Sequence, residues 1–163
     1  MTGAVGPARW AQERTLPTAE DTRAWGAHLA TGLRAGDVLV LAGELGAGKT
    51  TFVQGLADGL GVRGPITSPT FVIARSHPSL VGGPALVHVD AYRLGGAVEL
   101  DDLDLDTDVE DAVTVVEWGT GLAESLGGSG YLVVSLERAV GEDGDADPRV
   151  GRLVGFGARW RAR

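Results

Sequence analysis

VLVLAGELGAGKTTF, residues 38–52, combines three successive patterns. Val38–Ala42 is a short, wholly apolar, β-rich run, which is typical of a strand buried on both faces of a parallel sheet. A glycine-rich loop follows at Gly43. From Lys49 the apolar residues recur at helical spacing, and Gly61 ends that pattern. The stretch therefore predicts a strand, a loop and a helix in direct succession.

The loop fills every fixed position of the pattern G-x-x-x-x-G-K-[ST]. Its glycines let successive backbone N–H groups turn inward as an anion nest, and the following helix adds the positive end of its dipole. Lys49 supplies a point charge for the β- and γ-phosphates, and the Thr50 hydroxyl is a hard oxygen ligand suited to Mg²⁺. We therefore expect a phosphate loop that binds ATP with Mg²⁺. Its nucleotide-binding residues are Gly43, Glu44, Leu45, Gly46, Ala47, Gly48, Lys49, Thr50 and Thr51.

Lys49 is the only lysine in the chain, in which the other thirteen basic residues are arginine. A guanine-reading [NT]-K-x-D box would need a second lysine, so the composition favours ATP over GTP. The alternative to a phosphate loop is a glycine-rich turn without a ligand. The position of the loop between an apolar strand and an amphipathic helix argues against that alternative.

Two carboxylates follow apolar runs that read as strands. Asp90 ends Ala85–Val89, and Glu117 ends Val113–Val116. Because the carboxyl ends of parallel strands line the ligand site of an open α/β sheet, both residues are candidate Mg²⁺ ligands, together with Thr50. Both are also candidate catalytic residues, together with Lys49. Their spacing does not rank them. The working assignment places Asp90 beside Mg²⁺ and Glu117 on the attacking water, and the alternative is that one of them caps a turn.

The remaining patterns complete an α/β prediction. Thr18 with Asp21 reads as a capping box that opens a helix, and a short helix is expected near residues 120–126. Further strands are expected at Phe71–Ala74, at Tyr131–Leu136 and, as an edge strand, at Arg149–Phe156. The predicted architecture is a P-loop NTPase three-layer α/β/α sandwich, with a largely parallel central sheet extended by antiparallel strands.

Length and composition indicate one cytoplasmic domain. The 163 residues fit a single domain, with residues 1–13 and 141–148 expected to be flexible. Cysteine is absent, and no apolar run reaches the length of a membrane span. The net charge is -8, and eight of the thirteen residues from Glu99 to Asp111 are acidic. Such a surface is unsuited to direct nucleic-acid binding, and it is either a solvated face or a contact for a basic partner protein.

Four motifs together resemble the TsaE family, the small ATPase of bacterial tRNA threonylcarbamoyladenosine biosynthesis. They are GELGAGKTTF at 43–52, SPTF at 68–71, HVDAYRL at 88–94 and VVEWG at 115–119. The resemblance spans about residues 15–138. It implies an ATPase that is slow alone and works with the subunits TsaB and TsaD, so that tRNA is contacted only through the complex.

The resemblance also carries roles to individual positions. It assigns the Mg²⁺-linked threonine to Thr50, the motif aspartate to Asp90, and the glutamate and tryptophan of E-W to Glu117 and Trp118. Trp118 is expected either near the nucleotide or in the plain core. Residues 68–71 correspond to a switch-like loop, in which Thr70 is the expected nucleotide contact.

Two rival functions and one interface hypothesis remain. A small-molecule kinase would need an arginine-bearing lid, and the candidate positions, Arg75, Arg93 and Arg138, are not clustered in the sequence. A nucleotide-gated binding module would hold ATP without cleaving it, and the two strand-end carboxylates argue against it. For partner binding, residues 99–111 and the basic tail 159–163 are the candidate segments.

Overall fold

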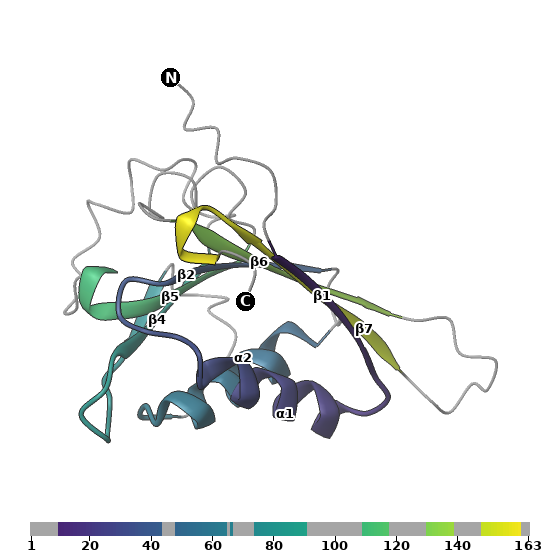
Figure 1. Ribbon diagram of the computed structural model, residues 1–163. Coiled ribbons are helices and arrows are strands. Elements are labelled where there is room, and N and C mark those ends of the chain that lie inside the picture. The colour runs from purple at the N-terminus through teal and green to yellow at the C-terminus, as the bar shows by residue number, and fades with distance from the viewer. Residues whose placement is uncertain are drawn as a thin grey trace.

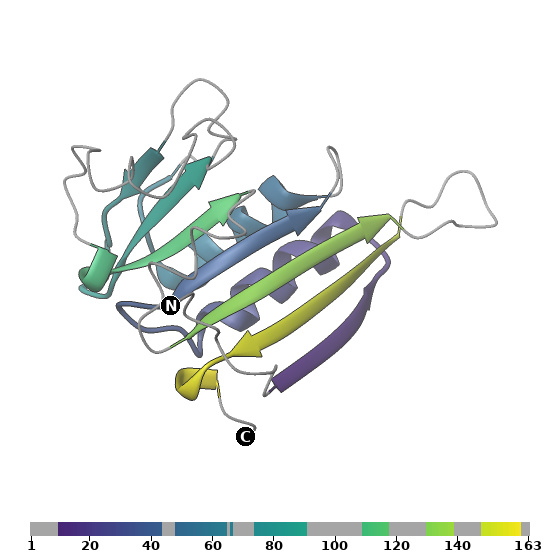
Figure 2. The same ribbon diagram turned by 90° about the horizontal axis from the view of Figure 1, so that it is seen from above.

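A seven-stranded mixed sheet forms the centre of the protein (Figure 2). The computed structural model describes residues 10–43, 48–64, 66, 74–90, 109–117, 130–138 and 148–160. The sheet order is β1-β7-β6-β2-β5-β4-β3. The strands are β1 Trp10–Leu16, β2 Val38–Gly43, β3 Ala74–His77, β4 Ala85–Asp90, β5 Ala112–Glu117, β6 Tyr131–Arg138 and β7 Arg149–Phe156.

The middle of this sheet is parallel and its flanks are antiparallel. β6, β2, β5 and β4 run in one direction, whereas β3 opposes β4, β7 opposes β6 and β1 opposes β7. Val38–Leu41 of β2 are buried, as an apolar strand between two parallel neighbours requires. The predicted α/β fold, with a parallel core extended by antiparallel strands, is confirmed.

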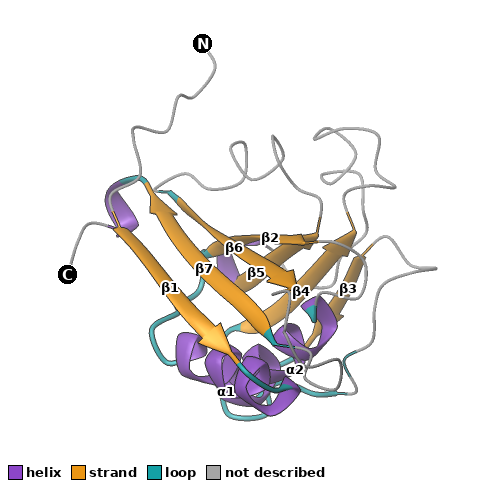
Figure 3. Cartoon of the chain, turned by 90° about the vertical axis from the view of Figure 1, so that its right-hand side faces the viewer, coloured by secondary structure: helices purple, strands orange, loops and turns teal. Residues whose placement is uncertain are grey.

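Both described α-helices pack against the same face of the sheet (Figures 1 and 3). They are α1 Ala19–Ala30 and α2 Lys49–Leu60, and they share one core cluster with the inward side chains of the sheet. In this cluster Trp25 meets Phe52 edge to face, with ring centroids 5.3 Å apart. The helix expected near 120–126 lies outside the described residues, so the third layer stays a prediction. No helix in the described ranges combines the length and apolar character needed to cross a membrane.

The start of α1 is fixed by the predicted capping box. The Thr18 hydroxyl accepts a hydrogen bond from the Asp21 backbone N–H, and the Asp21 carboxylate accepts one from the Thr18 N–H. These two bonds satisfy backbone donors that the first helical turn leaves without partners. The helix therefore begins where the sequence indicates.

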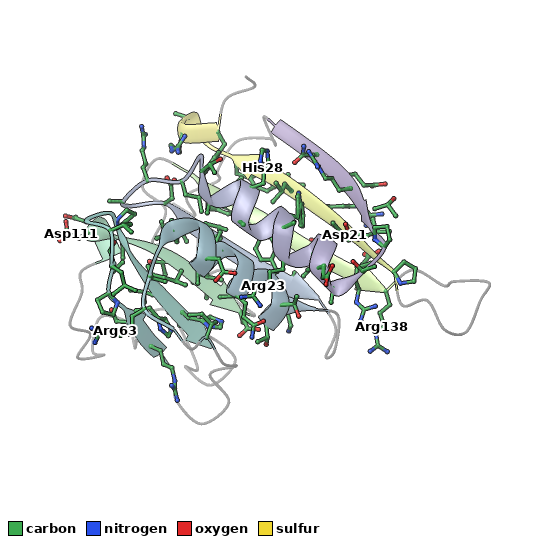
Figure 4. The ribbon with its side chains drawn as sticks, turned by 90° about the horizontal axis from the view of Figure 1, so that it is seen from below. Asp21, Arg23, His28, Arg63, Asp111 and Arg138 are labelled. Carbon is green, nitrogen blue, oxygen red and sulfur yellow. The ribbon has the colours of Figure 1, made fainter. Side chains whose placement is uncertain are left out.

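Glycines allow α1 and α2 to approach until their backbones touch. A methyl group at Gly55 would overlap the carbonyl oxygen of Arg23, and one at Gly26 would overlap that of Phe52. At the solvent side of the same contact, Arg23 on α1 donates to Asp58 on α2 at 2.7 Å (Figure 4). The phosphate-loop helix is thus held tightly against α1.

This close approach makes Gly55→Ala a destabilising substitution, although alanine normally favours a helix by about 1 kcal/mol over glycine. The new methyl must push α1 away, and overpacking of this kind costs about 1–3 kcal/mol. We expect the midpoint of denaturant unfolding to fall accordingly. The matched control is Gly32→Ala, because its added methyl would lie 3.7 Å from the nearest atom, the Leu29 carbonyl oxygen. Unfolding midpoints that are equal in the two variants would contradict this account of the helix contact.

The sheet edge differs from the sequence prediction. β7 was expected at the edge, but it lies between β6 and β1, and Arg152 on β7 forms ion pairs with Glu13 on one side and Glu137 on the other. The edge strand on this side of the sheet is β1, which begins at Trp10 and pairs along its whole length with β7. Residues 10–13, expected to be flexible, are therefore part of the sheet.

A second boundary differs in β3. The strand was expected at Phe71–Ala74, but it runs from Ala74 to His77 in register with β4, and residues 71–73 lie outside the described residues. His77 is also bound to the loop after α2, because its Nδ1 lies 3.1 Å from the Arg63 carbonyl oxygen. Pairing with β4 therefore continues the strand to the residue before Pro78.

The Arg159 side chain contacts three other residues of the protein. Its guanidinium binds the Asp37 carboxylate at 3.0 and 3.1 Å, donates to the Gly32 carbonyl oxygen at 2.9 Å and lies over the Trp160 ring. The ion pair between Arg159 and Asp37 joins the 3-10 turn Ala158–Trp160 to the turn before β2. The Arg159 side chain is 7% exposed and is therefore unsuited to the partner contact considered for the basic tail, whose residues 161–163 lie outside the described residues.

Candidate phosphate site at the carboxyl ends of the parallel strands

The ends of the predicted phosphate loop have the conformation that the motif requires. β2 ends at Gly43, level with Leu136 on β6, and α2 begins at Lys49. Gly48, at the N-cap of α2, has a φ of 98°, in the left-handed region that favours glycine. The chain therefore passes from the central strand to a helix N-terminus across a short loop. This places the positive end of the α2 dipole beside the strand ends.

Lys49 is buried at the first position of α2, with 8% of its surface exposed. Its Nζ lies 3.9 Å from Oε1 of Glu117, which ends β5 and is itself 7% exposed. A charge in such a place needs a counter-charge, because desolvation of an isolated ion is costly. The structure thus brings together two of the predicted site residues, one from a helix and one from the adjoining strand.

Asp90 lies at the matching position of the next strand. It ends β4 and is the cross-strand partner of Glu117 in the parallel register between β4 and β5. The described part of Asp90 is its backbone. The two carboxylate residues therefore occupy neighbouring strand ends, as the sequence pattern predicted.

A further side chain joins this group and was missed as a site residue. His88 begins the HVDAYRL motif but was not among the candidate site residues, and it is fully buried. Its Nε2 lies 2.9 Å from Oε2 of Glu117. The signal that could have found it is the spacing H-x-D, which puts His88 two residues before Asp90 and therefore on the same face of β4.

The other described polar residues predicted for the site lie in α2, β3 and β6. Thr50 and Thr51 lie in the first turn of α2 and are partly buried. Arg75 on edge strand β3 is exposed, and Arg138 is exposed at the end of β6 (Figure 4). The two arginines lie four strands apart in the sheet order, on either side of β2, so they do not form the cluster that a kinase lid would need.

His77 ends β3 on the far side from the strand ends, because its cross-strand partner is Leu86 near the start of β4. Burial lowers the pKa of its imidazole below the ordinary value of 6.5; the hydrogen bond to the Arg63 carbonyl oxygen opposes that shift, and the nearby His88 and Arg75 add to it. The ring is therefore neutral at neutral pH.

Several predicted positions lie outside the described residues. They comprise the middle of the phosphate loop, the switch-like loop, the residue after Glu117, one lid candidate, most of the acidic segment, and most of the segment 141–148 that was expected to be flexible. They are Glu44, Leu45, Gly46, Ala47, residues 68–71 with Thr70, Trp118, Arg93, residues 99–108 and residues 141–147.

The described oxygen groups suit Mg²⁺ better than a transition metal. Across the described part of the chain, no three His, Cys, Asp or Glu side chains gather in a way that could hold a metal ion by themselves. Mg²⁺ is bound in proteins by one or two oxygen side chains together with substrate phosphates and water, so it does not need such a cluster. A threonine in the first turn of α2 and carboxylate residues at two strand ends provide that kind of donor.

Residues 16–144 match the family model described as threonylcarbamoyl adenosine biosynthesis protein TsaE. The chain belongs to the TsaE family. The protein named tRNA threonylcarbamoyladenosine biosynthesis protein TsaE from Streptomyces coelicolor is 58% identical over 139 residues, which cover 85% of this chain and 93% of that one. The protein of the same name from Mycobacterium tuberculosis is 57% identical over 136 residues, covering 79% and 80% of the two chains.

The fold of this TsaE family member also matches a solved structure. The crystal structure of YdiB from Bacillus subtilis superposes with a TM-score of 0.69 at 31% sequence identity, covering 95% of this chain and 92% of that one. The likeness extends over nearly the full length of both chains. It therefore includes the antiparallel flanks of the sheet as well as the parallel core.

Proposed function

We propose that this TsaE family member is a Mg²⁺-dependent ATPase that acts in tRNA threonylcarbamoyladenosine biosynthesis. The observation that carries the proposal is the buried Lys49 ammonium at the start of α2, 3.9 Å from the Glu117 carboxylate at a parallel strand end. A cation at a helix N-terminus favours the β- and γ-phosphates, and a carboxylate beside it can act on water.

In this proposal each residue has a separate task. The backbone amides of residues 43–49 and the Lys49 ammonium hold the phosphates. Mg²⁺, when bound, neutralises developing charge on the phosphate oxygens, and the Thr50 hydroxyl with Asp90 would hold it. Glu117 orients the attacking water or accepts its proton. Thr70 and Trp118 are proposed further contacts to the nucleotide.

The chain is proposed to work in a complex with TsaB and TsaD, where its ATPase resets the assembly between turnovers. The net charge of -8 fits a subunit that reaches tRNA only through its partners, because direct binding to a phosphate backbone needs clustered basic residues. The proposed location is the cytoplasm, where tRNA is modified.

The test measures phosphate release from ATP by the chain alone and with TsaB and TsaD added. We expect slow release alone and faster release in the complex. Absence of phosphate release from the chain, both alone and in a single-turnover experiment with partners, would contradict the ATPase and would favour a nucleotide-gated binding module. Transfer of the labelled phosphate to a metabolite would instead indicate a kinase.

A further inference from the structure

The buried imidazole of His88 contacts the carboxylate of Glu117, which is the group proposed to act on the attacking water. His88 is 0% exposed, and its Nε2 lies 2.9 Å from Glu117 Oε2. Its other nitrogen, Nδ1, is buried and has no hydrogen-bond partner among the described residues. A buried N–H without an acceptor is unfavourable, so we expect the single ring proton on Nε2. The Nε2–H therefore donates to the carboxylate.

The two oxygens of Glu117 have different neighbours. Oε2 accepts from His88, whereas Oε1 lies 3.9 Å from the Lys49 ammonium. The terminal torsion of a glutamate is broad, so the carboxylate plane is poorly fixed without a partner. A short hydrogen bond to one oxygen from a buried ring fixes that plane. The other oxygen then stays on the side of the phosphate loop.

The sheet register makes this contact rigid. His88 is the cross-strand partner of Val115, and Glu117 is two residues further along β5, so the two side chains are diagonal neighbours on one face. Both side chains come from central strands of the sheet and are buried. A site built on such elements holds its geometry more tightly than one built on loops.

We propose that His88 is a positioning residue that holds Glu117 Oε2, so that Oε1 is kept beside Lys49 in the orientation the hydrolytic step needs. The inference rests on the proposed ATP hydrolysis. It predicts that His88 affects the rate of cleavage through Glu117 and leaves nucleotide binding nearly unchanged. A merely structural histidine would instead affect stability without a selective change in that rate.

The kinetic test compares His88→Leu, which fills the space without a donor, with His88→Gln, whose amide nitrogen can reach the position of Nε2. Loss of a group that orients a site ligand typically costs about 10- to 100-fold in activity, and we expect that loss in the single-turnover rate of His88→Leu. His88→Gln should recover most of the rate. The dissociation constant for ATP should stay within about threefold of the parent value in both variants, because neither removes a group assigned to the phosphates.

Several results would overturn the inference. They are an unchanged rate in His88→Leu, an equal loss in the leucine and glutamine variants, or a rise in the dissociation constant that accounts for the loss. If the leucine variant does not fold, His88→Asn replaces it, since its shorter amide does not reach Oε2. Failure of all three variants to fold would assign His88 a structural role. A parent chain that hydrolyses no ATP would contradict the proposed function instead, which the same assay shows separately.

A spectroscopic readout tests the contact without any turnover. The chain has three histidines, so ring signals in nitrogen-edited NMR spectra can be assigned with single variants. We expect a His88 ring with its proton on Nε2, slow to exchange with water, and loss of that protection in Glu117→Ala. A His88 proton on Nδ1, or protection that is the same without the Glu117 carboxylate, would contradict the proposed contact.

Discussion

Lys49→Ala is expected to weaken ATP binding by about 10- to 150-fold, because hydrogen bonds to charged groups contribute about 1.5–3 kcal/mol each. The chain has no other lysine, and this ammonium is buried at the helix N-terminus. Turnover should fall to background, since the same charge would stabilise the phosphates during cleavage. Isothermal titration with Mg·ATP measures the first effect, and phosphate release measures the second.

Arg138→Ala is the matched control for the loss of one positive charge. Arg138 ends β6, which is parallel to β2, so it lies at the same edge of the sheet as the phosphate loop, but its side chain is exposed. An exposed charge is screened by water and salt, and we expect affinity within about threefold of the parent. If Lys49→Ala and Arg138→Ala lose equal affinity for ATP, the loss is an effect of net charge, and the proposal that Lys49 binds the phosphates is wrong.

Glu117→Gln is expected to leave ATP binding at least as tight as in the parent while suppressing cleavage. A general base contributes about 100- to 10,000-fold to a rate, and an amide cannot accept the proton. Binding should not weaken, because the substitution removes the carboxylate that pairs with Lys49 at 3.9 Å. Single-turnover phosphate release, with the dissociation constant measured in parallel, separates the two effects.

The control for this substitution is Glu137→Gln. Glu137 is an exposed carboxylate on β6 that pairs with Arg152 at 3.2 Å, and exposed ion pairs contribute about 0–1 kcal/mol to stability. Its cleavage rate should equal that of the parent. Retention of more than about a tenth of the parent rate by Glu117→Gln would remove Glu117 from the hydrolytic step and leave Asp90 as the candidate.

The local parts of the site could be predicted from the sequence because each depends on a short pattern. Strand β2, the helix from Lys49 and the two strand-end carboxylates were all expected, and the structure has each of them. The contact between His88 and Glu117 could not be predicted in this way. It depends on the register between two strands, which brings together residues 29 positions apart in the chain.

The positions of β7 and β1 in the sheet also could not be predicted from short sequence patterns. β7 was correctly bounded, but its place in the sheet was wrong, because a strand's own residues do not reveal whether another strand covers its edge. The partner is β1, a mostly polar strand near the start of the chain. The close contact of α1 with α2 also could not be predicted from the sequence. Gly26 and Gly55 are unfavourable within a helix, and their presence is explained only by the backbone of the opposing helix, which each of them contacts.

Titration calorimetry of the intact, folded chain with Mg·ATP at two temperatures shows whether the phosphate site binds nucleotide. We expect saturable binding of one nucleotide per chain, and strong weakening of that binding in Lys49→Ala under the same conditions. A chain that is folded by circular dichroism and takes up no Mg·ATP at either temperature would contradict the phosphate site, and with it the proposed ATPase.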